Sequence, residues 1–302
     1  MKKDLLGIND LTTEDIRAII TRAIALKKDK RNTSYRPLVG KTIGLIFEKA
    51  STRTRVSFEA AMFQLGGSVT FLSTRDTQLA RQEPLADTAR VLSRYLDGLV
   101  IRTFAQETVE ELAAHATIPV INGLTDLYHP CQIVSDVMTV IEKKGAIENL
   151  RIAWVGDGNN VAHSWIEAAA TLGFSLSLAC PKDYEPRTDV LEPALKKAQK
   201  PILLLEDPTK AVEGADVINT DVWASMGQED EAAERRKVFQ PYQINSELLR
   251  RAKGDAIVLH CLPAHRGEEI TAEVLEGPPS VVFDQAENKL HVHKAILAMM
   301  IK

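Results

Sequence analysis

Apolar runs of strand length alternate with helical patterns along nearly the whole 302-residue chain, and this alternation restricts the fold more than any other feature. The predicted strands lie at residues 42–47, 68–72, 98–101, 119–121, 151–155, 175–179, 215–220, 256–259 and 281–283. The predicted helices lie at 13–27, 84–96, 107–116, 131–144, 161–172, 245–252 and about 287–302. Strands that alternate with helices at this spacing predict parallel sheets covered by helices on both faces.

A chain of 302 residues favours two domains. Two units of this kind fit the strands, with the break in the helix at 131–144 or in the turn at 144–149. We predict an α/β fold of two doubly wound domains, each with a parallel sheet flanked by helices, and an active-site cleft between them. The predicted first domain is 1–142 plus about 286–302, since the last helix follows the final strand and is expected to pack back on the first domain. The second domain is 143–285.

The charge balance excludes some classes of protein. A net charge of −4 and a pI near 6.0 argue against binding to nucleic acid or to an anionic membrane as the main function. No uninterrupted apolar run approaches the length that spans a membrane. Three scattered cysteines are too few for a disulfide framework and indicate a reducing compartment, so the expected location is the cytoplasm.

The segment Ser51-Thr52-Arg53-Thr54-Arg55 follows the first strand and opens a helical pattern. The first backbone N–H groups of a helix have no partner inside the helix, and the helix dipole favours negative charge there. Two arginines and three hydroxyl groups gather at the same point, whereas simple capping needs only one hydroxyl. We therefore predict a site for phosphate or another dense anion.

Other polar clusters also follow predicted strands, where open parallel sheets bind ligands. Arg102 ends one apolar run and is expected to meet the same anion. His129 and Gln132 flank Pro130 at the start of a helix, where a missing N–H costs nothing, and they present a donor and an amide.

The second half carries a different set of groups. Asn159 and Asn160 supply amides suited to a polar substrate, and Asp221 with Ser225 can bind an ammonium and a carboxylate, which together define an amino acid. Cys261 follows a strand and a histidine, which leaves open a nucleophile, a metal ligand or a polar contact. The chain has no cysteine and histidine spacing typical of zinc, so we expect no metal and no organic cofactor.

Taken together, these motifs resemble the aspartate/ornithine carbamoyltransferase family over essentially the whole chain. Ser51–Arg55 and His129-Pro130-Cys131-Gln132 are similar to motifs of carbamoyltransferases in general. Asp221 with Ser225-Met226-Gly227, and His260-Cys261-Leu262-Pro263, resemble the ornithine enzymes and not the aspartate enzymes. The resemblance implies transfer of the carbamoyl group of carbamoyl phosphate to the δ-amine of L-ornithine, giving L-citrulline and phosphate.

The resemblance also implies a role for each domain and each site residue. The first domain would bind carbamoyl phosphate, and its phosphate would be held by Ser51, Thr52, Arg53 and Thr54. Arg102 would bridge the phosphate and the carbonyl oxygen, and His129 would donate to that oxygen. Gln132 and the Leu262 backbone would fix the carbamoyl NH2 group. The second domain would bind ornithine through Asn160, Asp221, Ser225 and Met226, with Cys261 beside the attacking nitrogen.

Two features of the resemblance concern assembly and departures from the family pattern. Gln78 matches a residue that reaches into a neighbouring subunit's site, which implies a homotrimer or a multiple of it with shared active sites. Ala80 and Gln82 replace glycines in that segment. Lys289 stands where the family usually has arginine and loses its planar fork, so we expect somewhat weaker binding of carbamoyl phosphate.

Alternatives remain from the sequence. The acceptor can be N-acetylornithine, N-succinylornithine or putrescine, although Asp221 favours a free α-ammonium and Ser225 a polar amino-acid end. An NAD-dependent oxidoreductase would use the turn at Gly156 and Gly158, but no third glycine follows at the required spacing. A non-catalytic relative that binds anions is the third alternative. The physiological direction of the reaction stays open.

Overall fold

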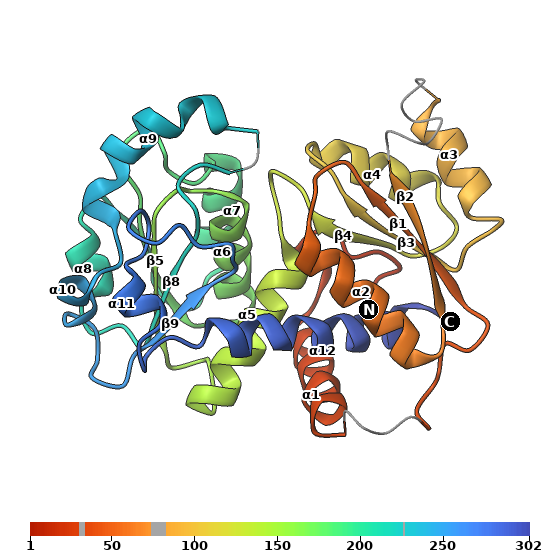
Figure 1. Cartoon of the computed structure of the whole chain (residues 1–302), viewed down its shortest axis with the longest axis horizontal. Helices are drawn as coiled ribbons and strands as arrows, with labels where there is room; N and C mark the ends of the chain where they lie inside the picture. The colour runs from red at the N-terminus through yellow and green to blue at the C-terminus, as the bar shows by residue number, and fades with distance from the viewer. Residues whose placement is uncertain (30–33, 74–82, 226) are drawn as a thin grey trace. The chain divides into compact units, whose positions relative to one another are not determined.

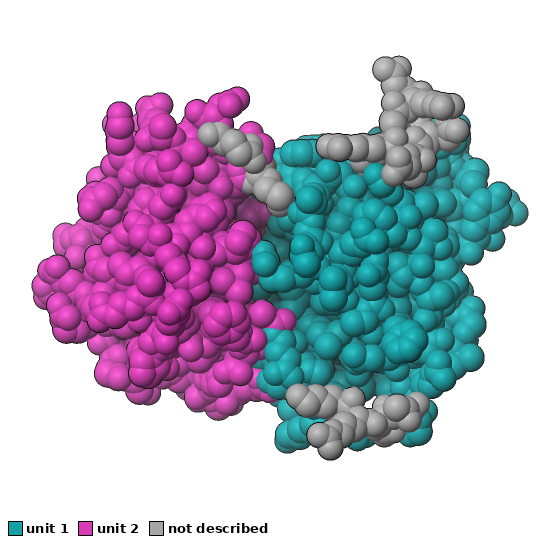
Figure 2. Space-filling model, viewed as in Figure 1, with its two compact units in different colours: residues 1–135, 287–302 teal, residues 136–286 magenta. Residues whose placement is uncertain are grey.

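The computed structural model describes residues 1–29, 34–73, 83–225 and 227–302. The chain forms two compact units (Figure 1, Figure 2). Unit 1 contains residues 1–135 and 287–302, and unit 2 contains residues 136–286.

Unit 1 is built on a four-stranded parallel sheet in the order β2-β1-β3-β4. Its strands are β1 (Thr42–Phe47), β2 (Ser68–Ser73), β3 (Gly98–Arg102) and β4 (Val120–Leu124). Its helices are α1 (Thr13–Lys28), α2 (Thr52–Leu65), α3 (Leu85–Leu92), α4 (Gln106–His115), the start of α5 (Pro130–Lys144) and most of α12 (Val282–Met300).

Helices cover both faces of the unit 1 sheet, as Figure 1 shows. Alternate residues of a strand point to opposite faces, so Leu99 and Ile101 of β3 lie on one face, where they pack against Ala89 of α3 and Leu112 of α4. Val100 points to the other face and is fully buried as well. Burial on both faces explains why the β3 sequence is a continuous apolar run.

Unit 2 holds a five-stranded parallel sheet in the order β7-β6-β5-β8-β9. Its strands are β5 (Arg151–Val155), β6 (Ser175–Ala179), β7 (Ile202–Leu205), β8 (Val217–Thr220) and β9 (Ile257–His260). Its helices include α6 (Asn160–Leu172), α7 (Thr188–Lys197), α8 (Pro208–Val212), α9 (Ala232–Phe239), α10 (Ser246–Leu249) and α11 (Ala272–Leu275).

The sheet of unit 2 is also covered by helices on both faces. Val155 of β5 and Ile218 of β8 pack in one cluster with Val212 of α8, Leu248 of α10 and Val274 of α11. Helices α6 and α7 lie on the other side of the sheet in Figure 1. Helix α6 is capped at its start by Asn159 and ends at Gly173, whose φ of 75° is easily adopted only without a side chain.

The predicted fold class is confirmed, because both units are parallel sheets flanked by helices. The strand predicted at 281–283 is wrong, since these residues lie at the start of α12. A short apolar run does not distinguish a strand from a buried helix turn. Here Val282, Gln285 and Asn288 are buried while Phe283 is 70% exposed, which is a helical pattern. Strand β7 and helix α7 were not predicted.

The polar stretch at 228–240 lies between β8 and β9. It forms a short 3-10 helix, Glu229–Glu231, followed by α9. Arg235 and Phe239 of α9 are buried, so one side of the helix packs on unit 2. None of the helices within the described ranges is long and apolar enough to cross a membrane.

The strand order of each sheet reverses direction at one point. In unit 1 this switch point lies between β1 and β3, where Phe47 and Arg102 are register partners. In unit 2 it lies between β5 and β8, where Trp154 pairs with Asn219. Loops leave a switch point in opposite directions and open a crevice at the carboxyl ends of the strands, which is where such folds bind ligands.

Candidate active site

The helix that follows β1 starts at the switch point of unit 1. Ser51 is the N-cap of α2, and its Oγ accepts a hydrogen bond of 3.2 Å from the Thr54 backbone N–H. The capping role that the sequence allowed for Ser51 is therefore present. Thr54 is buried, whereas Thr52 is exposed at the first turn. The helix starts with two threonines and two arginines and has no acidic side chain in its first turn, which suits an anion.

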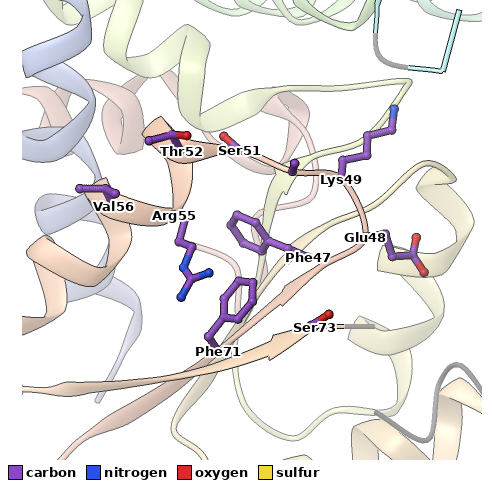
Figure 3. Close-up of a pocket in the computed structure, with 10 residues that line it drawn as sticks. Phe47, Glu48, Lys49, Ser51, Thr52, Arg55, Val56, Phe71 and Ser73 are labelled. Atoms are coloured by element: carbon purple, nitrogen blue, oxygen red, sulfur yellow. The ribbon is translucent and has the colours of Figure 1, made fainter. Parts of the chain in front are cut away.

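A pocket of about 530 Å³ lies beside this helix start (Figure 3). Ser51, Thr52 and Arg55 are among its lining residues. Arg55 points toward Phe71, with its guanidinium 3.6 Å from the ring centre, and its Nε donates to Glu59 at 2.8 Å. Arg55 is thus committed to these two contacts, and Arg53, half-buried on the same turn, is the arginine that we assign to the anion.

Arg102 ends β3 with only 5% of its surface exposed. Its backbone oxygen accepts a hydrogen bond of 2.8 Å from the Glu48 N–H, just before α2 begins. The register of the sheet therefore brings Arg102 to the same switch point as the Ser51–Arg55 segment, as the sequence predicted.

His129 and Gln132 stand at the start of α5, also in unit 1. Burial, with smaller contributions from Lys289 and Arg102, lowers the pKa of His129 well below its usual range. The imidazole is therefore neutral at neutral pH, and it can donate one N–H to an oxygen without carrying charge. Lys289 Nζ donates to Gln132 Oε1 at 3.0 Å.

His293 is a residue of this region that the sequence did not single out. It is fully buried on α12, one turn after Lys289. Its Nδ1 lies 2.9 Å from Ser57 Oγ, and its ring stacks on Phe58 at 3.7 Å, so it joins α12 to the anion-binding helix. Burial and the nearby Lys289 lower the pKa of His293 well below its usual range. No sequence signal marks this contact, because its partners are more than 200 residues away.

At the switch point of unit 2, two groups converge on the carboxylate of Asp221. Cys261 Sγ donates to Oδ1 at 3.0 Å, and Asn159 Nδ2 donates to Oδ2 at 3.1 Å. Asn159 also caps α6 by accepting from the Val161 and Ala162 backbone N–H groups. The sequence predicts substrate contacts from both asparagines of this turn, and Asn159 is the one whose amide is bonded to Asp221.

The turn from β5 to α6 depends on its glycines. Gly156 has a φ of 137°. A Cβ on Gly158 would lie 2.2 Å from the Pro186 nitrogen, and the Gly158 N–H donates to the Tyr184 oxygen at 2.8 Å. These glycines let the chain pass close to the segment at 184–186. They therefore serve this close approach between backbone segments and do not form the glycine pattern of a dinucleotide-binding turn. Asn160 follows, nine-tenths buried, as the first residue of α6.

The turn after β9 is held by the His260 ring. Nε2 of His260 lies 3.0 Å from Glu269 Oε1, and Nδ1 accepts from the Leu262 N–H at 2.9 Å. Leu262 has a φ of 57°, which is rare for a side chain of this kind. Asp221, His260 and Cys261 offer ligand atoms within 4.8 Å of one another. Because both ring nitrogens already have partners, the set suits a polar contact to substrate better than a metal ion.

Ser225 is half-buried beyond β8. Its backbone N–H donates to Gln228 Oε1 at 3.0 Å. Arg235 of α9 holds the same segment: it donates to the Trp223 oxygen at 2.9 Å and lies 3.2 Å from Asp157 Oδ2. Two predicted site residues, Gln78 and Met226, lie outside the described residues, as do Ala80 and Gln82.

Comparison with known families accounts for both units. The carbamoyl-P binding domain of the family "Aspartate/ornithine carbamoyltransferase" matches residues 3–142, and its Asp/Orn binding domain matches residues 148–300. The chain belongs to the aspartate/ornithine carbamoyltransferase family. The resemblance inferred from the sequence is thereby confirmed.

Relatives within the family are similar over their full length. An ornithine carbamoyltransferase of Desulfotalea psychrophila is 64% identical over 298 residues, covering 98% of each chain. One of Syntrophus aciditrophicus is 61% identical over 302 residues, covering 100% of both. The solved structure of the ornithine carbamoyltransferase from Pyrococcus furiosus has a TM-score of 0.95 and 53% identity, and the match covers 99% of this chain and 96% of that chain.

Proposed function

We propose that this chain transfers the carbamoyl group of carbamoyl phosphate to the δ-amine of L-ornithine, giving L-citrulline and phosphate. The observation that carries the choice of acceptor is Asp221, whose carboxylate is bonded by the Cys261 thiol and the Asn159 amide at the switch point of unit 2. The family takes either aspartate or ornithine. A carboxylate at this position suits a cationic acceptor and repels one with an additional carboxylate.

In this proposal unit 1 binds carbamoyl phosphate. Support comes from the start of α2, where Ser51, Thr52, Arg53 and Thr54 offer hydroxyl groups, backbone N–H groups and a cation to the phosphate. Arg102 bridges the phosphate and the carbonyl oxygen. His129, neutral because burial lowers its pKa, donates to the carbonyl oxygen.

Three further residues complete the donor side of the proposal. Gln132 and the Leu262 backbone hold the carbamoyl NH2 group, and Lys289 donates to Gln132 Oε1 at 3.0 Å. Lys289 contributes positive charge, although its ammonium group lacks the planar, paired N–H donors of an arginine guanidinium.

Unit 2 binds ornithine in this proposal. Asp221 pairs with an ammonium group, Asn160, Ser225 and Met226 hold the amino-acid end, and Cys261 lies beside the attacking nitrogen. A positive φ at Leu262 turns the chain directly after Cys261, which supports a role of this turn in presenting both residues to substrates. The cleft shared by the two domains remains a prediction of the sequence.

The chemistry explains why these residue types are needed. An amine attacks only when it is neutral, and deprotonation of an amine with a pKa of ~10.4 at pH 7.4 costs roughly 4 kcal/mol. Desolvation of the amine lowers that cost, with Cys261 and Asp221 as its nearest polar partners. Negative charge then grows on the carbonyl oxygen and on the leaving phosphate, where Arg53, Arg102 and His129 stabilise it. One such donor is typically worth about 3–4 kcal/mol.

The proposal extends to assembly and location. A homotrimer, or a multiple of it, with Gln78 reaching a neighbouring subunit's site, is the expected assembly. A cytoplasmic location fits the three cysteines, Cys131, Cys180 and Cys261, which are all free thiols. Burial of Cys131 raises the pKa of its thiol to about 12, so this thiol, next to the predicted donor site, is inert.

The experiment is product formation from carbamoyl phosphate with a panel of acceptors: ornithine, N-acetylornithine, N-succinylornithine, putrescine and aspartate. We expect a ureido product and phosphate to appear together with ornithine alone. Turnover with another acceptor would retain the carbamoyl phosphate site and contradict the role of Asp221. No turnover with any acceptor would favour the non-catalytic relative.

A further inference from the structure

The end of strand β9 has a backbone group that the sheet cannot satisfy. Strand β9 is the last named strand of its sheet and pairs with β8 on one edge, while its other edge carries a single isolated bridge between Val258 and Ser280. On that second edge the Val258 N–H donates to the Pro279 oxygen at 2.9 Å. The N–H of His260, two residues further along, points to the same edge, because N–H directions alternate along a strand. His260 is 1% exposed, so this N–H needs a partner within the protein.

The side chain of Gln285 supplies that partner. Its Oε1 accepts from the His260 N–H at 2.9 Å, and its Nε2 donates to Asp136 Oδ1 at 2.7 Å. Gln285 lies on α12 and Asp136 on α5, and all three residues belong to unit 2. Gln285 is 1% exposed and Asp136 is fully buried.

The three groups fix one another by their hydrogen-bonding capacity. A carboxylate only accepts and a backbone N–H only donates, so the residue between them must donate at one end and accept at the other. A primary amide does this, and Asp136 selects the orientation in which Oε1 faces His260. Glutamate at position 285 would have the same shape but would place two buried carboxylates side by side.

We propose that Asp136 and Gln285 are positioning residues for the reaction, because they fix the point from which the His260-Cys261-Leu262 turn starts. From that point the Cys261 thiol reaches Asp221 at 3.0 Å, and the His260 ring accepts from the Leu262 N–H. Neither residue needs to touch a substrate. This inference rests on the proposed function, since it concerns the same turn.

The test uses variants that reverse the polarity of the pair. Gln285→Glu removes the donor that faces Asp136 and is expected to lower kcat/KM for ornithine at least tenfold. The double variant Asp136→Asn/Gln285→Glu restores both hydrogen bonds, with asparagine as the donor and glutamate as the acceptor, and should recover most of the loss. Asp136→Asn alone keeps an acceptor for Gln285 and should lose less than Gln285→Glu.

Two measurements separate positioning from general stability. The dissociation constant of inorganic phosphate, which unit 1 residues bind, should change less than twofold in Gln285→Glu. The exposed Gln240→Glu puts the same charge change elsewhere in unit 2 and should leave the kinetics as in the wild type.

Activity of Gln285→Glu within twofold of the wild type, or a loss that the double variant does not recover, would overturn the inference. If a thermal melt shows that the double variant is not folded, Gln285→Met, which has neither polar group, is used in its place. It must then show the same loss of kcat/KM as Gln285→Glu, with phosphate binding retained. A wild type that turns over no ornithine would refute the proposed function itself, whereas an active wild type with unaffected variants would refute only this inference.

Discussion

The stability of unit 2 should depend on pH through Asp157, which follows β5. Burial raises the pKa of this carboxyl from 3.8 to about 6, although the Arg235 guanidinium, 3.2 Å from its Oδ2, acts in the opposite direction. Only 8% of Asp157 is exposed, so solvent screens the pair weakly. The folded state therefore binds this proton more tightly than the unfolded chain does.

The sign and size of the effect follow from that difference. An acid whose pKa is raised by folding adds stability at low pH, and the contribution is lost as pH rises through the folded pKa. A shift from 3.8 to about 6 corresponds to about 3 kcal/mol in total. Between pH 4.5 and 7.5 the contribution of Asp157 should fall by about 2 kcal/mol.

The perturbation is Asp157→Asn, which keeps the shape of the side chain and does not titrate. Urea unfolding followed by tryptophan fluorescence gives the free energy of unfolding of each protein across this pH range. All three tryptophans, Trp154, Trp165 and Trp223, are buried in unit 2, so the signal reports the unit that contains Asp157. Taking the difference between wild type and variant removes the titration of every other group.

We expect the free energy of unfolding of the wild type, relative to Asp157→Asn, to decrease with rising pH. A difference that stays constant within 0.5 kcal/mol, roughly the accuracy of such data, would show that Asp157 titrates alike in both states. A difference that increases with pH would show that Arg235 outweighs burial and lowers the pKa. Asp183→Asn, an exposed carboxylate of the same unit, is the matched control for loss of one carboxylate.

Three shorter predictions concern the site. Arg53→Ala should lower kcat/KM for carbamoyl phosphate by far more than a hundredfold, whereas Arg55→Ala, whose guanidinium is held by other side chains, should lose much less; equal losses in steady-state assays would contradict our assignment. Gly158→Ala puts a Cβ 2.2 Å from a neighbouring backbone atom, so the free energy of unfolding should fall by about 3 kcal/mol or more, and an unchanged melting temperature would refute this. Cys261→Ser keeps a hydrogen-bond donor and should retain more activity than Cys261→Ala, while complete inactivity of both variants would favour a nucleophilic cysteine.

The sequence predicted the elements whose signal is local. Apolar runs such as 98–101 and 151–155 became central strands, because strands buried on both faces must be continuously apolar. Polar residues placed directly after those runs, such as Arg102 and Asp221, lie at the switch points, since the carboxyl ends of parallel strands meet at one edge of a sheet. Ser51–Arg55 was found for the same reason, because a helix start is readable from its own residues.

Other features depend on partners far away in the sequence, and no local pattern predicts them. His293 gains its place from Ser57 and Phe58, and Gln285 from Asp136 and His260. The run at 281–283 was misread because three apolar residues fit either period. Edge strand β7 is a run of only four apolar residues, with the adjacent Leu203 and Leu204 exposed at 48% and 39%, and so short a run fits a strand or a helix turn equally well.

The two crossings of the chain between units have a consequence for biosynthesis. Helix α5 begins in unit 1 and ends in unit 2, and α12 runs from unit 2 back into unit 1. The last turns of α12 bury Val292, Ile296 and Leu297 in unit 1. A ribosome makes these residues after the whole of unit 2, so residues 1–135 are translated long before unit 1 can be completed.

Unit 2 is continuous, and all of its residues have been made before α12 is complete. It is therefore expected to fold first during translation. Until α12 has been made, the apolar side chains of unit 1 that α12 covers stay exposed and are available to chaperones. A gene fragment that stops near residue 142 should yield an aggregating protein for this reason. Joining residue 135 to residue 287 through a short flexible linker should give a self-sufficient unit 1.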